Sequence, residues 1–396
     1  MAFSFCIFIV SKVAIQKLTI EEFLQLVQTN PVFDVRSPGE YDHAHIPGAY
    51  NLPLFTNDER AVVGTAYKQQ GKQPAIKIGL DYFGVKMKAI VEAVEDNVSC
   101  FSLNDKAPGK SAGSQRETAN KKQETRNVLV HCWRGGMRSA GIAWLLDLYG
   151  FKVYTLIGGY KAYRKWVRGQ FEKPQPLTVL GGYTGSGKTI VLHQLQEAGL
   201  PVVDLEAMAN HKGSAFGAIG QNAQPTQEMF ENFLAEKLYE IAGHQVTAGQ
   251  VLQGAFIEDE SQRIGDLKIP DAFWKQMRNS NILFLDIPFE ERLNYLTVEY
   301  GKAGKEKLVN AIIRIQKRLG GLEAKNAVNF LLEDNHKECF RILLKYYDKW
   351  YEKGLYNRES PVELIKKISA EKVNAKENTG LLLNDSNVEE SITETE

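Results

Sequence analysis

The sequence predicts an α/β protein of two domains, and two observations support this prediction. Its 396 residues exceed the roughly 250 to 300 at which a single hydrophobic core stops growing. A strand, a glycine-containing loop and a helix also follow one another twice, near residues 128–149 and 177–198, which is the order of βαβ units. The expected parts are a first domain at 14–172 with a disordered insertion at 96–127, a second domain at 177–370 and a disordered tail at 371–396.

The first domain begins with alternating helical and strand patterns. Thr19 precedes Glu21 and Glu22, which predicts a capped helix over 19–29, and a short apolar strand follows at 32–35. After the polar insertion, the pattern predicts strands at 128–130 and 153–157 around a helix at 137–149. A basic helix over 160–171 then meets Pro174 and Pro176, which mark the domain boundary.

The second domain reads as a doubly wound parallel sheet. Apolar strands are expected at 177–180, 201–205, 251–257 and 281–285, with helices between them. From residue 289 to about 369 the pattern is helical throughout. In such a sheet the ligand site lies at the carboxyl ends of the strands.

Composition restricts the classes of function. The 48 basic and 48 acidic side chains balance, so a nucleic-acid partner must be held by local basic patches. Four scattered cysteines indicate a reducing, cytoplasmic setting without a disulfide framework. The apolar start, Met1–Val10, is about half of a membrane span, so we expect an extra extended segment or a misassigned start and no membrane segment.

The first candidate site is the loop Cys132-Trp-Arg-Gly-Gly-Met-Arg138. A cysteine between a strand and a helix lies at the helix N-terminus, where backbone N–H groups favour the nucleophilic thiolate. The same groups, with Arg134 and Arg138, suit an oxyanion such as phosphate or thiosulfate. Gly135 and Gly136 let the loop curl. His131 precedes this cysteine and is expected to pack or lie at the surface.

The second candidate site is the loop Gly182-Tyr-Thr-Gly-Ser-Gly-Lys-Thr189. It fits the pattern G-x-x-x-x-G-K-[ST], a P-loop, in which consecutive N–H groups wrap phosphate oxygens, the lysine reaches the terminal phosphate and the hydroxyl serves Mg²⁺. Such a loop contacts the polyphosphate and not the base of a nucleotide. Both a nucleotide and a prenyl diphosphate are therefore possible ligands at this point. The expected diphosphate-binding residues are Gly182, Gly185, Ser186, Gly187, Lys188 and Thr189, the last also a candidate Mg²⁺ ligand.

Acidic and aromatic residues add further candidates. Carboxylates at predicted strand ends that could form a metal shell or act in catalysis, or else cap helices, are Asp204, Glu206, Glu258, Asp259 and Glu260. Basic residues at 314–325 precede four aromatics at 346–351. This combination suits stacking on single-stranded RNA, although helical spacing favours a core and a solvated face.

Several segments resemble the rhodanese domain. These are Asp34-Val-Arg-Ser-Pro-Gly-Glu-Tyr41, His45-Ile-Pro-Gly-Ala49, Asn51-Leu-Pro53, the Cys132 loop and Gly158-Gly159-Tyr160. The resemblance implies a cysteine that carries a persulfide or perselenide. The loop departs from the usual rhodanese length, because five residues separate Cys132 from Arg138, as in rhodanese-like dual-specificity phosphatases. A wider loop suggests a phosphate-bearing donor.

The order of the two domains, with further segments, resembles the tRNA 2-selenouridine synthases over residues 16–365. These segments are Asn57-Asp-Glu-Arg60, Gly64-Thr-Ala-Tyr-Lys-Gln-Gln-Gly71, Asp204-Leu-Glu206, His211-Lys-Gly-Ser-Ala-Phe-Gly217 and Glu258-Asp-Glu-Ser261. The resemblance implies that sulfur of wobble 2-thiouridine in tRNA is replaced by selenium from selenophosphate. It also implies an S-geranyl intermediate made from geranyl diphosphate, with selenium passing through or beside Cys132 and no tightly bound cofactor.

Three other readings fit the same residues. A P-loop small-molecule kinase with a rhodanese-like regulatory domain would consume ATP without needing the thiol. A non-catalytic tRNA-binding protein would tolerate loss of both Cys132 and Lys188. A phosphatase would hydrolyse aryl phosphates through Cys132 without a selenium donor.

Overall fold

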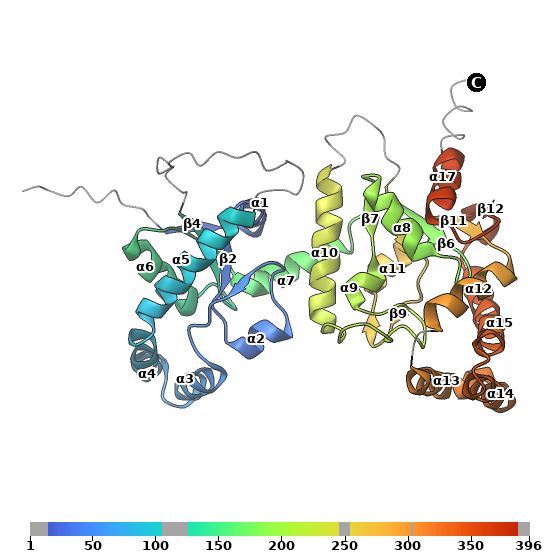
Figure 1. The fold of residues 1–396 in the computed structure, drawn as a ribbon. Coiled ribbons are helices and arrows are strands. Elements are labelled where there is room, and N and C mark those ends of the chain that lie inside the picture. The colour runs from blue at the N-terminus through green and yellow to red at the C-terminus, as the bar shows by residue number, and fades with distance from the viewer. Residues whose placement is uncertain (1–14, 105–125, 245–253, 302–303, 387–396) are drawn as a thin grey trace, which may run out of the picture. The chain divides into compact units, whose positions relative to one another are not determined.

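The chain folds into two compact units, Met1–Val167 and Arg168–Glu396 (Figure 1). The structure is a computed structural model that describes residues 15–104, 126–244, 254–301 and 304–386. Each unit is built on a five-stranded sheet whose neighbouring strands all run parallel. Parallel strands require crossover connections, and helices supply them here. The α/β class expected from the sequence is therefore confirmed.

The sheet of the first unit has the strand order β1-β5-β4-β2-β3. Its strands are β1 (Gln16–Leu18), β2 (Val32–Asp34), β3 (Tyr50–Asn51), β4 (Asn127–His131) and β5 (Lys152–Leu156). Its helices are α1 (Ile20–Val27), α2 (Pro38–His43), α3 (Asn57–Gln69), α4 (Lys72–Gly84), α5 (Met87–Asn104), α6 (Met137–Tyr149) and α7 (Gly159–Gln170). The register pairs Asp34 with His131, so the carboxyl ends of β2 and β4 lie side by side.

Local sequence signals explain several element boundaries in this unit. Thr19 accepts a hydrogen bond from the Glu22 N–H, and the Glu22 side chain bonds back to the Thr19 N–H, which forms the expected capping box at α1. Thr56 and Glu59 repeat the arrangement at α3. The apolar residues Val128, Leu129 and Val130 of β4 are buried at the sheet centre, as expected for a strand covered on both faces.

The expected insertion begins later than predicted. Residues 96–104 continue α5, and Val98 is buried in the core of this unit. The polar composition from residue 95 onward suggested a loop, but Val94 and Val98 lie one helical turn apart and both pack inward. Residues 105–125 of the predicted insertion lie outside the described residues, and its last residue, Asn127, already belongs to β4.

The sheet of the second unit has the order β12-β11-β6-β8-β7. Its strands are β6 (Leu177–Gly181), β7 (Val202–Val203), β8 (Ala255–Glu258), β11 (Asn281–Asp286) and β12 (Ile365–Ser369), and β9 (Arg263–Ile264) and β10 (Leu267–Lys268) form a separate hairpin. Its helices are α8 (Lys188–Glu197), α9 (Leu205–Ala209), α10 (Gln227–His244), α11 (Asp271–Arg278), α12 (Phe289–Tyr300), α13 (Lys305–Leu319), α14 (Gly321–Leu332), α15 (His336–Leu355), α16 (Pro361–Leu364) and α17 (Ala375–Ser386). Strand β6 is central, so the glycine loop leaves the middle of the sheet.

Two expectations for the C-terminal part were wrong. The segment 365–369 was read as helical, yet it forms β12, an edge strand paired with β11. Residues 375–386 were assigned to a disordered tail, yet they form α17, and Leu382 joins Leu192 and Leu285 in a buried cluster. Residues 387–396 lie outside the described part. The helical region from α12 to α15 was expected, and α12 to α15 share a core of their own.

Candidate functional site

The cysteine loop joins the end of β4 to the start of α6. The Cys132 sulfur accepts a hydrogen bond from the Gly136 N–H at 3.3 Å and lies 3.2 Å from the Ser139 hydroxyl oxygen. The cysteine is 3 % exposed and is a free thiol. Gly136 caps α6, so the thiol does lie at a helix N-terminus as the sequence predicted.

The loop is held from outside by the first residues of α7. The Tyr160 N–H donates to the Cys132 carbonyl at 2.8 Å. Gly159 has a φ of 59°, and a Cβ there would lie 2.2 Å from the Cys132 carbonyl oxygen. Gly135 has a φ of 64°, and a Cβ there would lie 2.5 Å from the Leu156 carbonyl oxygen. Both positions therefore require glycine, which explains the Gly158-Gly159-Tyr160 segment.

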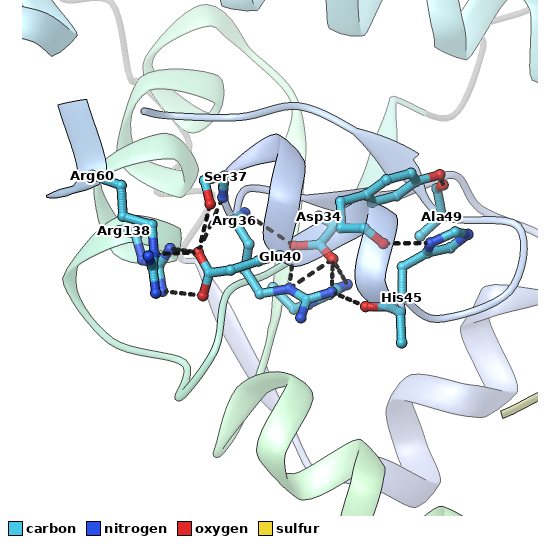
Figure 2. Close-up of polar contacts among 11 residues, drawn as sticks. Asp34, Arg36, Ser37, Glu40, His45, Ala49, Arg60 and Arg138 are labelled. Atoms are coloured by element: carbon cyan, nitrogen blue, oxygen red, sulfur yellow. Dashed lines mark hydrogen bonds and ion pairs between the residues drawn. The ribbon is translucent and has the colours of Figure 1, made fainter. Parts of the chain in front are cut away.

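The two arginines of the loop have different surroundings. Arg138 donates to Glu40 at 2.7 Å, and Arg60 contacts the same carboxylate at 2.9 Å (Figure 2). Burial opposes ionisation of Glu40, but the hydrogen bond and charge of Arg138 outweigh it and lower the pKa of Glu40. Arg134 is exposed and has no ion-pair partner among the described residues. Sequence reasoning missed Glu40, which precedes Arg138 by 98 positions.

A buried ion pair lies at the adjacent strand end. Asp34 accepts from the Arg36 Nε at 2.9 Å (Figure 2). The Arg36 guanidinium stacks on Tyr160 at 3.9 Å from the ring centroid. His131 is fully buried, 3.8 Å from Asp34, and burial lowers its pKa. Packing rather than surface exposure is therefore the outcome for His131. The Asp34-Val-Arg36 segment fixes the strand end beside the cysteine.

The glycine loop leaves β6 and enters α8. Gly182, Gly185 and Gly187 all have positive φ values, 151°, 81° and 75°, which lets the loop N–H groups turn toward one site. The Lys188 ammonium donates to the Gly182 carbonyl at 2.8 Å. Ser186 Oγ is buried without a hydrogen-bond partner among the described residues. The predicted loop thus joins a strand to a helix, with glycine at the positions where its backbone has positive φ.

Three carboxylates converge beside this loop. Oxygens of Glu206, Glu258 and Glu260 lie within 4.8 Å of one another, and Thr189 Oγ1 lies 3.4 Å from Glu206. Burial and then the charge of Glu258 raise the pKa of Glu206 to about 10 and that of Glu260 to about 8. Burial also raises the pKa of Glu258. Such a group of oxygen ligands fits Mg²⁺, because a cation removes the mutual repulsion.

The other two acidic candidates have different partners. Asp204 accepts from the Ala207 N–H and so caps α9, and it also contacts His193 at 3.0 Å. Asp259 accepts from the Tyr351 hydroxyl at 2.8 Å and pairs with Arg358. The acidic shell therefore consists of Glu206, Glu258 and Glu260.

The helical region braces the glycine loop. The Tyr351 hydroxyl, from α15, accepts from the Gly182 N–H at 3.1 Å. Burial and then Asp259 raise the pKa of Tyr351 well above its ordinary value. The buried Arg292, from α12, donates to the Thr184 carbonyl at 3.1 Å and to both carboxylate oxygens of Asp348. Tyr351 was noted in the sequence only as one of an aromatic group, and its contact with the loop is 169 positions away.

The fold and these two sites define a two-domain α/β protein in which a rhodanese-like domain precedes a P-loop domain. Residues 19–78 match the family described as the rhodanese-like domain. Residues 175–379 match the tRNA 2-selenouridine synthase AAA domain. The chain belongs to the tRNA 2-selenouridine synthase family.

Relatives support this assignment over most of the chain. The tRNA 2-selenouridine synthase of Shewanella woodyi is 34% identical, with 89% of this chain and 95% of that protein covered. The enzyme of the same name from Nitrosomonas europaea is 35% identical, with 69% of this chain and 64% of that protein covered. A solved structure titled as the N-terminal domain of a putative ATP/GTP binding protein from Clostridium difficile 630 is 38% identical, covers 39% of this chain and 98% of that chain, and has a TM-score of 0.29.

Within the described residues, no helix is both long enough and apolar enough to cross a bilayer.

Proposed function

We propose that this protein is a tRNA-modifying transferase that replaces sulfur by selenium in wobble 2-thiouridine. Selenophosphate is the selenium donor, and S-geranyl-2-thiouridine, made from geranyl diphosphate, is the intermediate. The observation that carries the proposal is the family match along most of the chain, joined to a thiol loop in one unit and a diphosphate-type loop in the other.

The P-loop serves the alkylation step in this proposal. The 2-thiouridine sulfur attacks C1 of geranyl diphosphate, the C1–O bond breaks, diphosphate leaves and N3 loses its proton. Lys188 and the loop N–H groups hold the departing diphosphate, whose negative charge they stabilise. Glu206, Glu258 and Glu260 would hold a Mg²⁺ ion, which would neutralise part of the same charge. Alkylation makes the sulfur a good leaving group.

The Cys132 thiol serves the selenium step. Its sulfur attacks phosphorus of selenophosphate, the P–Se bond breaks and hydroselenide leaves. Hydroselenide attacks C2 of the alkylated uridine, its proton moves to N3 and the C2–S bond breaks, which releases geranyl thiolate. Water then hydrolyses the S–P bond and frees phosphate. No atom changes oxidation state on this route, whereas a Cys132 perselenide formed from selenophosphate requires an oxidant.

The proposal is tested by mass spectrometry of nucleosides from 2-thiouridine tRNA. We expect the geranylated nucleoside with geranyl diphosphate alone and selenouridine when selenophosphate is also present. Lys188→Ala should block the first product yet convert pre-geranylated tRNA, and Cys132→Ala should show the reverse. Cys100→Ser, which alters an exposed free thiol, is the matched control. Full selenation by Cys132→Ala would overturn the role of the thiol. Unchanged thiouridine together with ATP consumption would favour the small-molecule kinase.

A further inference from the structure

A large apolar pocket lies in the first unit, against α6, the helix that follows the cysteine loop. Its volume is about 720 Å³, within the range of small-molecule sites. Helices α3, α4 and α6 line it, with Gly64, Leu80, Phe83, Met137 and Trp144 among the lining residues. Apart from Arg138, none of the site residues assigned above lines it, so the Cys132 site and the P-loop do not account for its apolar interior.

The exposure of its apolar walls is unusual for a protein surface. Leu80 is 57 % exposed, Met137 53 % and Trp144 51 %. Soluble proteins rarely expose large apolar side chains side by side, and where they do the patch is commonly a binding site. The walls therefore indicate an apolar ligand.

One end of the pocket is lined by residues that directly follow the cysteine loop. Gly136, whose N–H contacts the Cys132 sulfur at 3.3 Å, directly precedes the lining residues Met137 and Arg138. The lining residues of α6 run from Met137 to Trp144, which at the rise of an α-helix is about 10 Å. A ligand in the pocket can thus reach from the cysteine loop along the helix.

The end of the pocket near the loop is charged. Arg60 and Arg138 line the pocket, and both contact Glu40 (Figure 2). Two guanidinium groups against one carboxylate leave an excess of positive charge, which suits the phosphates of an RNA backbone. The pocket therefore combines an apolar interior with a cationic edge.

We propose that this pocket holds the geranyl chain of the S-geranyl nucleoside while its C2 atom faces Cys132. The inference rests on the proposed function and adds the place where the alkyl group is recognised. Three chain bonds extend about 3.5 Å, so the eight-carbon main chain of geranyl is on the order of 9 Å long, close to the length of the α6 wall. The pocket would select the alkylated nucleoside over plain 2-thiouridine and then retain the geranyl thiol that leaves.

A pocket-filling substitution tests this without removing a contact. Gly64 is helical, and a Cβ added there meets nothing within 4 Å, so Gly64→Leu should fold and occupy part of the cavity. Gly84→Leu is the matched control, because Gly84, the last residue of α4, is also in a helix, has open space around an added Cβ and does not line the pocket. Leu80→Gln, at an exposed wall position, is a second variant that makes the interior polar without a change of fold.

The probes are two anticodon stem-loop RNAs that differ only in S-geranyl-2-thiouridine or 2-thiouridine, bound to the full-length protein. We expect the native protein and the control Gly84→Leu to bind the geranylated RNA on the order of tenfold or more tighter than the 2-thiouridine RNA, since each buried CH₂ contributes measurably to affinity. Gly64→Leu and Leu80→Gln should bind the two RNAs almost equally. A folded Gly64→Leu that keeps the preference would overturn the inference.

Activity separates this inference from the proposed function. Selenation of the geranylated RNA should slow in Gly64→Leu and stay native in Gly84→Leu. If the native protein selenates this RNA and Gly64→Leu does so equally well, the pocket assignment fails and the proposed function stands. If the native protein prefers the geranylated RNA and loses that preference in Gly64→Leu, yet makes no selenouridine, the pocket assignment stands and the proposed reaction fails.

Discussion

The substitution Asp34→Asn tests how much the buried Asp34–Arg36 ion pair stabilises the end of β2 beside the cysteine loop. Asp34 and Arg36 have side-chain exposures of 0 % and 2 %, and the carboxylate accepts from the Arg36 backbone N–H and from its Nε and Nη2 atoms. Asparagine keeps the shape and one acceptor oxygen but leaves the buried guanidinium without its counter-ion. Removing one partner of a buried pair typically costs 3 to 5 kcal/mol, and the retained acceptor puts the expected loss near the low end, about 3 kcal/mol.

Hydrogen exchange read by mass spectrometry measures this loss within the first unit. Amides of β2 and β4 should exchange roughly 150-fold faster, which corresponds to about 3 kcal/mol. Peptides from β11 provide an internal reference in the second unit. Glu92→Gln is the control variant, because it breaks an exposed pair with Lys88 at 3.4 Å and should cost about 0.5 kcal/mol or less. Equal protection of β2 and β4 in Asp34→Asn and the native protein would refute the reasoning.

Three further predictions follow from the sites. The pKa of Asp34 is lowered, against the effect of burial, by His131 and Arg36, so its stabilisation is present above its ordinary value of 3.8 and is lost as the pH falls; protection of β2 measured between pH 5 and pH 2 should decline in the native protein and less in Asp34→Asn. Millimolar Mg²⁺ should raise the free energy of unfolding, by about 2.7 kcal/mol at a hundredfold excess over Kd, and therefore raise the melting temperature. Glu258→Gln should abolish this shift in a thermal melt. Gly159→Ala places a methyl group against the Cys132 carbonyl, so selenation of pre-geranylated tRNA should fall sharply while geranylation persists; unchanged selenation in the nucleoside assay would contradict this.

Local signals made both loops predictable from the sequence. A buried strand, closely spaced glycines and a following helix specify the course of the chain within about ten residues, and Cys132 and Lys188 lie where this pattern puts them. The convergence of Glu206 with Glu258 also followed from the rule that parallel strands end at one edge of the sheet. These features depend on short-range geometry.

Long-range contacts could not be predicted in the same way. The salt bridge between Glu40 and Arg138 joins positions 98 apart, and the contact of Tyr351 with Gly182 joins positions 169 apart. The strand β12 was missed because its apolar residues alternate weakly and its strand conformation depends on pairing with β11. Each of these required the tertiary arrangement, which propensity and periodicity do not contain.

Tyr351 and Arg292 hold the glycine loop through hydrogen bonds, and these contacts limit where the second unit can be truncated or fused to a relative. A fragment that ends after β11 contains the complete G-x-x-x-x-G-K-[ST] motif. It lacks the Tyr351 hydroxyl on the Gly182 N–H, and it also lacks Arg292, which donates to the Thr184 carbonyl, together with the Asp348 carboxylate that pairs with Arg292. The smallest autonomous phosphate-binding fragment must therefore extend at least through α15. Chimeras that exchange the helical region between relatives should be joined so that the loop and α15 come from the same parent.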